Sequence, residues 1–259
     1  MPLSLVGSEM CIRDSYDGET IIGIETNEVG VEKDGTRGDR YQPGIKIFAR
    51  QTVLAEGCYG FITEQVIERY HLRKNAQPQS YAIGVKEVWR VDNEAFEDGL
   101  AIHTIGWPLD ADTYGGSFIY HYQKDRIAIG LVIGLDFKNP YLNPHSELQR
   151  FKHHPKIKPM FEHGTCLGYG SRALNEGGIQ AIPQLTFPGG VIVGCAAGFL
   201  NNVRIKGTHC AMQSGILAAQ AIYPHLKNNT PSSEIKTYEK NLRASWIIDC
   251  LLYTSPSPR

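Results

Sequence analysis

Apolar and polar residues alternate along several short segments in the middle of the chain. The clearest segment is RIAIGLVIG, in which Ile127, Ile129, Leu131 and Ile133 share one face and small residues share the other. The segments YAIGVKEVWRV, LAIHTIGW and GSFIYHYQ, which precede it, have a similar pattern. This alternation predicts antiparallel strands with one face turned towards a core.

Other segments carry helical spacing or strand-like runs. Residues 61–71 (FITEQVIERYH) place their apolar side chains on one helical face, and residues 232–246 (SSEIKTYEKNLRASW) predict a second amphipathic helix. A further helix is expected over 144–154, ending near the prolines that follow. Residues 20–25 and 44–55 are predicted to be strands. The chain therefore combines an α/β body with a β-rich insertion.

The stretch from Gly194 to Gly215, GCAAGFLNNVRIKGTHCAMQSG, carries the strongest chemical signal. The apolar strand GGVIVGC runs into a loop with Gly198 and Gly207, and a helix rich in small residues follows. Glycines let a ligand approach the backbone, and the helix start at Gly207–Thr208 points free amide donors into the same space. A flavin, with its pyrophosphate and C2 carbonyl, suits that arrangement. The pattern alone fits an ordinary strand-to-helix turn equally well.

Composition narrows the possible functions. The chain has 259 residues, 42% of them hydrophobic, and its 27 glycines suit a cofactor-binding α/β protein. Its net charge of −1 gives no electrostatic reason to expect nucleic acid as a partner. Apolar runs stay well short of the ~20 residues that a membrane-spanning helix needs. The six scattered cysteines form no C-x-x-C pair, so they predict a reducing compartment and no metal site.

Four sequence blocks resemble electron-transfer flavoprotein:ubiquinone oxidoreductases. They are ARQTVLAEGCYG (49–60), GWPLDADTYGGSFIYHY (106–122), EGGIQAIPQLTFPGG (176–190) and GFLNNVRIKGTHCAMQSGILAA (198–219). The glycine loop is shared with geranylgeranyl reductases and other FAD enzymes, whereas YGGSFIYH together with LTFPGG is more specific. The resemblance extends over about residues 16–247.

The resemblance implies a partial glutathione-reductase-like FAD-binding fold with an inserted antiparallel quinone-binding sheet. We expect residues 16–75 and 186–249 to belong to the FAD-binding domain and residues 76–185 to the ubiquinone-binding domain. The G-x-G-x-x-G segment that opens such folds is absent, so only the rear half of the FAD site is expected. Residues 1–15 and 250–259 read like translated sequencing adapter, so we expect them to be non-native and exclude them from the prediction of the fold. The chain is expected to be an internal fragment.

Three residues in the first half are implied FAD contacts. Glu56, Gly57 and Gly60 lie where a strand ends and a helix follows, a position that in similar flavoproteins contacts the adenosine part of FAD. Glu56 could instead be a helix cap or a salt-bridge partner.

The second half supplies the other implied FAD contacts. Donors at the helix start, aided by the helix dipole, could stabilise negative charge on the reduced ring. Cys195 replaces the aspartate of many relatives, so the ribityl contact must weaken or pass to another group. Phe199 could cover the ring or be part of the core, and His209 is expected to be structural. The implied contacts here are Gln180, Gly198, Phe199, Lys206, Gly207 and Thr208.

The ubiquinone site is implied at Tyr114, Gly115 and Gly116. Two successive glycines before an aromatic strand leave bare backbone beside a flat apolar wall, which suits a quinone ring. The alternative is a type I′ or II′ hairpin turn, which has the same signature. Tyr120, Tyr122 and Trp107 could be pocket walls or core residues.

The implied activity is FAD-dependent electron transfer from reduced electron-transfer flavoprotein to ubiquinone in the respiratory chain. Such chemistry requires no nucleophile, so no catalytic residue is assigned. The family's four-iron four-sulfur cluster has its ligands in a segment absent here. Monotopic attachment to a bacterial inner or mitochondrial inner membrane is implied. The alternatives are a geranylgeranyl-reductase-like FAD enzyme and a non-catalytic β-rich binding module.

Overall fold

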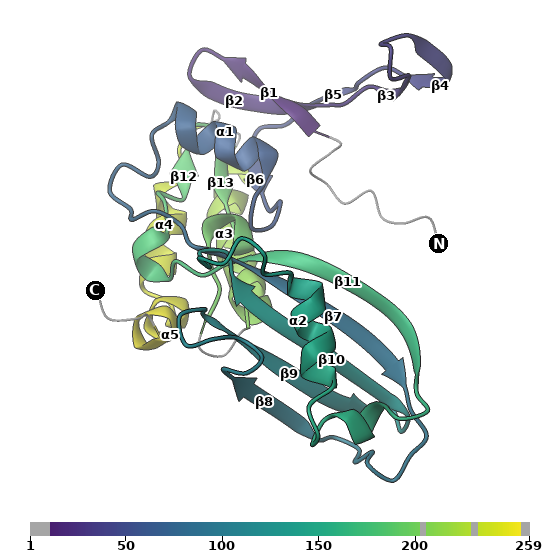
Figure 1. Ribbon diagram of the computed structural model, residues 1–259. Helices are drawn as coiled ribbons and strands as arrows, with labels where there is room; N and C mark the ends of the chain where they lie inside the picture. The colour runs from purple at the N-terminus through teal and green to yellow at the C-terminus, as the bar shows by residue number, and fades with distance from the viewer. Residues whose placement is uncertain (1–10, 203–205, 229–232, 255–259) are drawn as a thin grey trace. The chain divides into compact units, whose positions relative to one another are not determined.

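The structure is a computed structural model that describes residues 11–202, 206–228 and 233–254 (Figure 1). The chain divides into two compact units. Unit 1 combines Met1–Gln79 with Asn175–Arg259, and unit 2 is the continuous segment Ser80–Leu174. Unit 2 therefore starts and ends inside the limits 76 and 185 expected for the inserted domain.

Unit 2 is built on a five-stranded sheet in the order β11-β7-β10-β9-β8 (Figure 1). The pairs β7–β10, β9–β10 and β8–β9 are antiparallel, as the alternating pattern predicts. The strands are β7 (Tyr81–Arg90), β8 (Ala101–Ile105), β9 (Gly115–Tyr122), β10 (Arg126–Gly134) and β11 (Thr165–Asn175).

Helix α2 (Pro144–Lys152) covers one face of this sheet, and the short 3₁₀ helix η2 (Lys158–Phe161) follows it. Asn143 begins α2 because its side chain accepts hydrogen bonds from the amides of His145 and Ser146. Beneath the helix, the alternating isoleucines of β10 pack with Leu148 and Phe151 in one buried cluster. The period-two pattern of β10 therefore selects the face that the helix covers.

Unit 1 contains a small sheet in the order β12-β13-β6, in which β13 and β6 are parallel. The core includes Phe187, Phe199 and Tyr238, all fully buried. Its strands are β6 (Thr52–Leu54), β12 (Thr186–Phe187) and β13 (Gly190–Ile192). Its helices are α1 (Phe61–Arg69), η3 (Ile179–Ala181), η4 (Gly194–Ala197), α3 (Thr208–Lys227), α4 (Lys236–Arg243) and α5 (Trp246–Thr254).

Two small antiparallel sheets complete unit 1. One has the order β1-β2-β5 and the other is the pair β3-β4. The strands are β1 (Cys11–Asp17), β2 (Thr20–Thr26), β3 (Val29–Val31), β4 (Arg37–Gln42) and β5 (Lys46–Phe48). The single strand predicted over 44–55 is therefore wrong: its first part, β5, pairs with β2, and its last part, β6, pairs with β13. The two pieces pair in different sheets.

Parts of both terminal segments take part in the fold. Residues 11–15 lie in β1, which pairs with β2, and residues 250–254 continue α5, where Leu251 is buried. Backbone pairing and apolar burial therefore include these residues in the fold. Residues 1–10 and 255–259 lie outside the described residues. A non-native origin for the two ends stays a prediction.

The helix predicted over 232–246 is also divided. Its described part forms α4, with Tyr238 and Leu242 buried, and α4 ends at Arg243 before a new helix begins at Trp246. The Ser245 hydroxyl donates to the carbonyl of Leu242, which closes the turn between them. Within the described parts of the chain, no helix is both long enough and apolar enough to cross a bilayer.

Candidate functional site

The turn from β6 to α1 holds Glu56, Gly57 and Gly60. The Glu56 carboxylate accepts hydrogen bonds from the amides of Ile62 (3.2 Å) and Thr63 (2.7 Å), and from the Thr63 hydroxyl (2.7 Å). It therefore satisfies free donors at the start of α1, which is one of the alternatives left open by the sequence. Any contact of Glu56 with FAD stays a prediction.

Glycine is favoured at Gly57 by the backbone conformation and at Gly60 by the lack of space for a side chain. Gly57 has φ of +92°, a left-handed conformation that favours glycine. At Gly60, a Cβ atom would meet the Glu56 carboxylate at 2.6 Å and the Thr63 hydroxyl at 2.7 Å. Gly60 thus makes room for the capping carboxylate. These local reasons hold whether or not adenosine lies nearby.

The glycine loop after β13 begins with the 3₁₀ turn η4 and ends in the left-handed Gly198, with φ of +91°. The amide of Gly194 donates to the Ser214 hydroxyl of α3 at 3.0 Å, which ties the loop start to the helix. Asn201 and Lys206 form an antiparallel bridge across the loop. Residues 203–205, which this bridge encloses, lie outside the described residues.

Helix α3 starts at Gly207 without a side-chain cap among the described residues. Its first amides and its dipole are therefore available to an anion or a polarised carbonyl. A Cβ on Gly207 would lie 3.0 Å from Leu200 and 3.6 Å from the Cys195 sulfur, so the backbone here is closely packed. Burial raises the pKa of the Cys195 thiol, which keeps it a neutral, weak acceptor. This donor set fits a flavin.

Gln79 brings two predicted flavin segments together, and sequence reasoning missed it. Its side-chain oxygen accepts from the amide of Gly177 at 2.7 Å, and its side-chain nitrogen lies 2.9 Å from where a Cβ of Gly198 would stand. The Asn202 side chain also donates to the carbonyl of Glu176. The turn that contains Gln180 therefore lies beside the glycine loop. Gln79 belongs to unit 1, and a single glutamine carries no sequence pattern that reveals these contacts.

Phe199 has the structural role that the sequence left open. Its side chain is fully buried in the core of unit 1, and the Leu200 side chain is 5% exposed. A ring without accessible surface cannot cover a flavin, so the interpretation of the Phe199 side chain as a ring cover is wrong. Its apolar size is used for packing instead. The prediction that Phe199 contacts the flavin then concerns its backbone atoms only.

His209 stacks on Trp246, with ring centroids 5.5 Å apart, and its Nε2 lies 3.9 Å from the Cys250 sulfur. His209 was expected to be a structural imidazole that pairs with backbone, and these partners are side chains instead. With Cys210, these groups could approach a metal ion. Burial raises the pKa of Cys210 to about 11, and a metal requires the thiolate. The absence of a metal site stays a prediction.

Gly115 and Gly116 are the first residues of β9, paired with Ile133 and Val132 of β10. The hairpin-turn alternative is wrong, because both glycines lie inside a strand ladder. A Cβ on Gly115 would collide with the carbonyl oxygen of Val132, and a Cβ on Gly116 would lie 2.7 Å from the carbonyl oxygen of Thr104. Glycine therefore allows the strands to approach closely and leaves bare backbone at this end of the sheet.

The sheet face opposite α2 carries an aromatic row beyond Gly116. Phe118 and Tyr120 stack with centroids 5.0 Å apart, and the Phe118 ring covers Gly130. Tyr114, just before the glycines, is 54% exposed. Bare backbone beside aromatic rings is the combination expected for a quinone, although contact with quinone stays a prediction.

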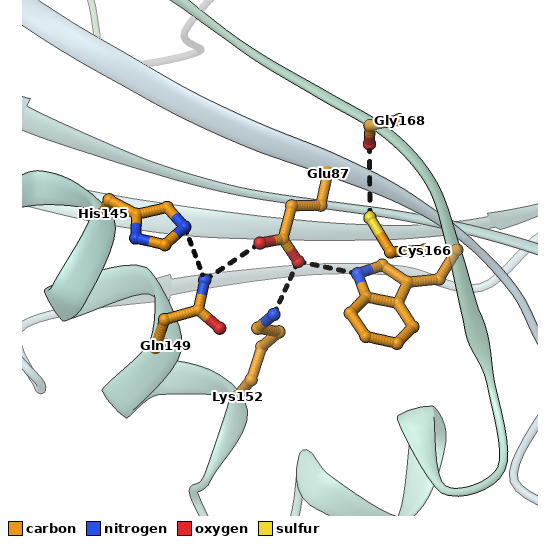
Figure 2. A network of polar contacts seen from close by, with 7 residues as sticks. Glu87, His145, Gln149, Lys152, Cys166 and Gly168 are labelled. Carbon is orange, nitrogen blue, oxygen red and sulfur yellow. Dashed lines mark hydrogen bonds and ion pairs between the residues drawn. The ribbon is translucent and has the colours of Figure 1, made fainter.

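A buried ion pair fixes α2 on the other face (Figure 2). Glu87 of β7 is 5% exposed, and its carboxylate accepts from Lys152 (2.6 Å) and Gln149 (2.9 Å). The indole nitrogen of Trp89 donates to it at 2.7 Å. Burial raises the pKa of Glu87, but these three donors outweigh burial and hold it below its usual value.

Comparison with known proteins first defines the class. Solved structures with the same fold include a geranylgeranyl bacteriochlorophyll reductase-like protein from Thermoplasma acidophilum (TM-score 0.66, 16% identity, 90% of this chain and 53% of that chain). A flavoprotein/dehydrogenase from Cytophaga hutchinsonii has a TM-score of 0.58 at 15% identity, over 96% of this chain and 59% of that one. The fold is therefore the glutathione-reductase-like fold of FAD-dependent oxidoreductases, as predicted.

The sequence comparisons define the family. Residues 81–174 match the family described as ETF-QO, ubiquinone-binding. The chain is 48% identical over 239 residues to the human mitochondrial electron transfer flavoprotein-ubiquinone oxidoreductase, and 51% identical over 231 residues to that of Arabidopsis thaliana. These matches cover 90% and 88% of this chain but 39% and 36% of the relatives. The chain is thus similar to this family over most of its length, and unit 2 is similar to the family's ubiquinone-binding domain.

Proposed function

We propose that this chain forms the ubiquinone-binding sheet and part of the FAD-binding domain of an electron-transfer flavoprotein:ubiquinone oxidoreductase. The observation that carries the proposal is the family match over 81–174, which includes the bare backbone at Gly115 and Gly116. The quinone ring lies against these two glycines, and Tyr114 borders it. The substrate pair is reduced electron-transfer flavoprotein and ubiquinone.

The residues of unit 1 hold the rear half of the FAD site. Amides of Gly207 and Thr208 at the start of α3 face the electron-rich edge of the ring, and Lys206 adds positive charge nearby. Gln79 accepts from the Gly177 amide and lies beside Gly198, so the turn that contains Gln180 and the glycine loop support the same region. Glu56, Gly57 and Gly60 lie near the adenosine part. When bound, FAD supplies the one-electron and two-electron chemistry that links a flavoprotein donor to a quinone.

The finer features of the family complete the proposal. In the full-length protein, the four-iron four-sulfur cluster is held by residues other than those of this chain. Attachment to the mitochondrial or bacterial inner membrane is monotopic, through the end of the sheet nearest the glycine pair. Exposed apolar side chains at the ends of β8, β9 and β10 support this attachment: Ile105, Trp107, Tyr114 and Leu135. Such a cluster suits contact with lipid.

A chimera tests the proposed function. Residues 16–247 replace the matching segment of the human relative, so the host supplies the remaining parts of the FAD site. We expect the chimera to bind FAD and to reduce a ubiquinone analogue with electrons from reduced electron-transfer flavoprotein. A chimera that binds FAD but reduces no quinone contradicts the proposal.

Two other functions are less well supported. The chain is only 16% identical to the geranylgeranyl bacteriochlorophyll reductase-like protein, so this similarity shows a shared fold and no shared function. A non-catalytic module would bind no flavin in the chimera. Reduction of an isoprenoid double bond, in place of ubiquinone, would favour the reductase alternative.

The chain by itself is expected to bind little or no FAD. It contains the glycine loop at Gly198–Gly207 but no G-x-G-x-x-G segment, so the main pyrophosphate cradle is missing. The measurement is the flavin absorbance of the purified chain after incubation with excess FAD and gel filtration. A stoichiometric flavin spectrum would show that the rear half suffices for binding.

A further inference from the structure

The open face of the unit 2 sheet is the face opposite α2, and strand register defines its members around the glycine pair. Gly116 of β9 lies directly opposite Ile105 of β8, and Phe118 lies opposite His103. Tyr120 follows on the same face of β9, because alternate residues of a strand share a face. His103 is therefore the diagonal neighbour of Gly116.

His103 and Tyr120 form a hydrogen-bonded pair on this open face. The Tyr120 hydroxyl lies 3.1 Å from Nε2 of His103, and the two rings meet edge to face with centroids 5.5 Å apart. Tyr120 is held from its other side by the Phe118 ring, which rests on Gly130. The pair is thus oriented by packing, while His103 is exposed to solvent.

The spacing brings this pair within reach of a quinone held at the glycines. Diagonal neighbours across an antiparallel pair are separated by about 7–8 Å between their Cα atoms. A quinone ring has its two carbonyl oxygens on opposite sides, so a ring that lies against Gly116 directs one oxygen along the sheet towards His103 and Tyr120. The distance from Gly116 to His103 is therefore short enough for the Tyr120 or His103 side chain to reach this quinone oxygen.

We propose that Tyr120 and His103 deliver a proton to the ubiquinone bound at Gly115–Gly116. This inference rests on the proposed function. Complete reduction of one ubiquinone consumes two electrons and two protons and converts both carbonyl oxygens to hydroxyl groups. The electrons come from reduced electron-transfer flavoprotein. As charge reaches the near oxygen, the Tyr120 hydroxyl gives it a proton, and His103 returns a proton to Tyr120 through Nε2.

Solvent then restores the proton on His103, because its side chain is exposed. The second proton, for the far oxygen, is not assigned to this pair. General acid catalysis by a positioned side chain of this kind contributes on the order of 10²–10⁴ in rate. Tyr120 is thus the catalytic residue, and His103 is the residue that returns a proton to it.

The other titratable and charged groups on the open face are placed by the same register. On β7, β9 and β10 they are Lys86, Arg90, Arg126 and Tyr122. Lys86 lies opposite Gly130 on the far side of β10 from β9, and Tyr122 lies one position further from Gly116 than Tyr120. His103 and Tyr120 are the nearest of these groups to the glycine pair.

The test uses the FAD-loaded chimera with Y120F, H103Q and the double variant. Y169F on β11, where Tyr169 is 88% exposed, and H153Q at the end of α2 are matched controls. Each protein is assayed with a ubiquinone analogue and with a ferricenium salt, which accepts an electron without a proton. We expect Y120F to lower the quinone rate about 100-fold, with the ferricenium rate and both controls unchanged.

The pH profile separates proton delivery from a structural role. The quinone rate of the unsubstituted chimera should depend on pH, and this dependence should be absent in H103Q. The double variant should be no slower than Y120F, since both residues act in one path. Wild-type quinone rates in Y120F and H103Q would overturn the inference. A chimera that reduces ferricenium but never ubiquinone would refute the proposed function itself.

Discussion

Replacement of Lys152 by methionine is expected to lower the free energy of unfolding of unit 2 by about 3–5 kcal/mol. Lys152 is the cationic partner of Glu87, whose side chain is 7% exposed. Without the lysine, the carboxylate stays in the interior with only the neutral donors Gln149 and Trp89. Urea unfolding followed by tryptophan fluorescence measures the loss, and Trp89 reports on this region directly.

The matched control is Glu147→Gln on the same helix. Glu147 pairs with Arg150 at 2.7 Å, and the side chains of Glu147 and Arg150 are 14% and 56% exposed. Because Arg150 reaches solvent, breaking this pair should cost at most about 1 kcal/mol. Equal effects of K152M and E147Q would contradict the assignment of Glu87–Lys152 as a buried pair.

The double variant Glu87→Leu with Lys152→Met should recover most of the stability lost in K152M. A buried ion pair that is replaced by apolar side chains of similar volume is often neutral or stabilising, because both desolvation costs disappear. The Lys152 ammonium also lies over the Trp89 ring, 4.7 Å from its centroid. A double variant as unstable as K152M would show that the loss came from this contact and not from the stranded charge.

The same pair makes unit 2 sensitive to acid. The donors around Glu87 hold its pKa in the folded state below the ordinary value of 4.5. Its contribution to stability is therefore complete above about pH 4.5 and is lost as pH falls through the folded pKa. An acid titration of the unfolding free energy should show this slope, and E87L with K152M should reduce it.

Replacement of Gly116 by alanine in the chimera is expected to lower ubiquinone reduction about 100-fold. The added Cβ would stand 2.7 Å from the carbonyl oxygen of Thr104, so β8 and β9 must move apart at the proposed quinone contact. A displacement of about 1 Å in a positioned site can cost this much rate. The measurement is the rate with a ubiquinone analogue at saturating reduced electron-transfer flavoprotein.

Gly168→Ala on β11 of the same sheet is the control for this substitution. A Cβ at Gly168 would meet nothing within 4 Å, so the change should leave both stability and rate unchanged. FAD content and ferricenium reduction should stay normal in G116A, because unit 1 is not altered. A G116A chimera with a normal quinone rate would remove the glycine pair from the proposed site.

Local patterns predicted the elements whose signals lie in adjacent residues. The alternation in β7, β9 and β10 predicted antiparallel strands, and the apolar spacing of α1 and α2 predicted helices close to the observed ones. The break between β5 and β6 escaped prediction because both pieces are strand-like, and their partners β2 and β13 are distant in sequence. The predicted strand over 44–55 is divided because β5 and β6 pair with strands of different sheets, whereas strand propensity is similar in both pieces.

For the candidate site, glycine-rich motifs indicated where the backbone would be exposed to ligands, but not what each residue does there. Glu56 looks like a ligand contact in the sequence, whereas its carboxylate caps α1. Gln79 and His103 carried no recognisable pattern, because their partners, Gly177 and Tyr120, come from separate segments. Side-chain roles of this kind depend on which strands and loops become neighbours.

The amino-acid sequence by itself determined the strand and helix periodicities, the glycine positions and, through its motifs, the family. These features depend on neighbouring residues, and steric limits on the backbone act within that range. Only the tertiary structure decided that Phe199 belongs to the core, that Glu87 and Lys152 are buried together, and that His103 meets Tyr120. These contacts join residues distant in the chain, and burial and strand register exist only once the chain has folded.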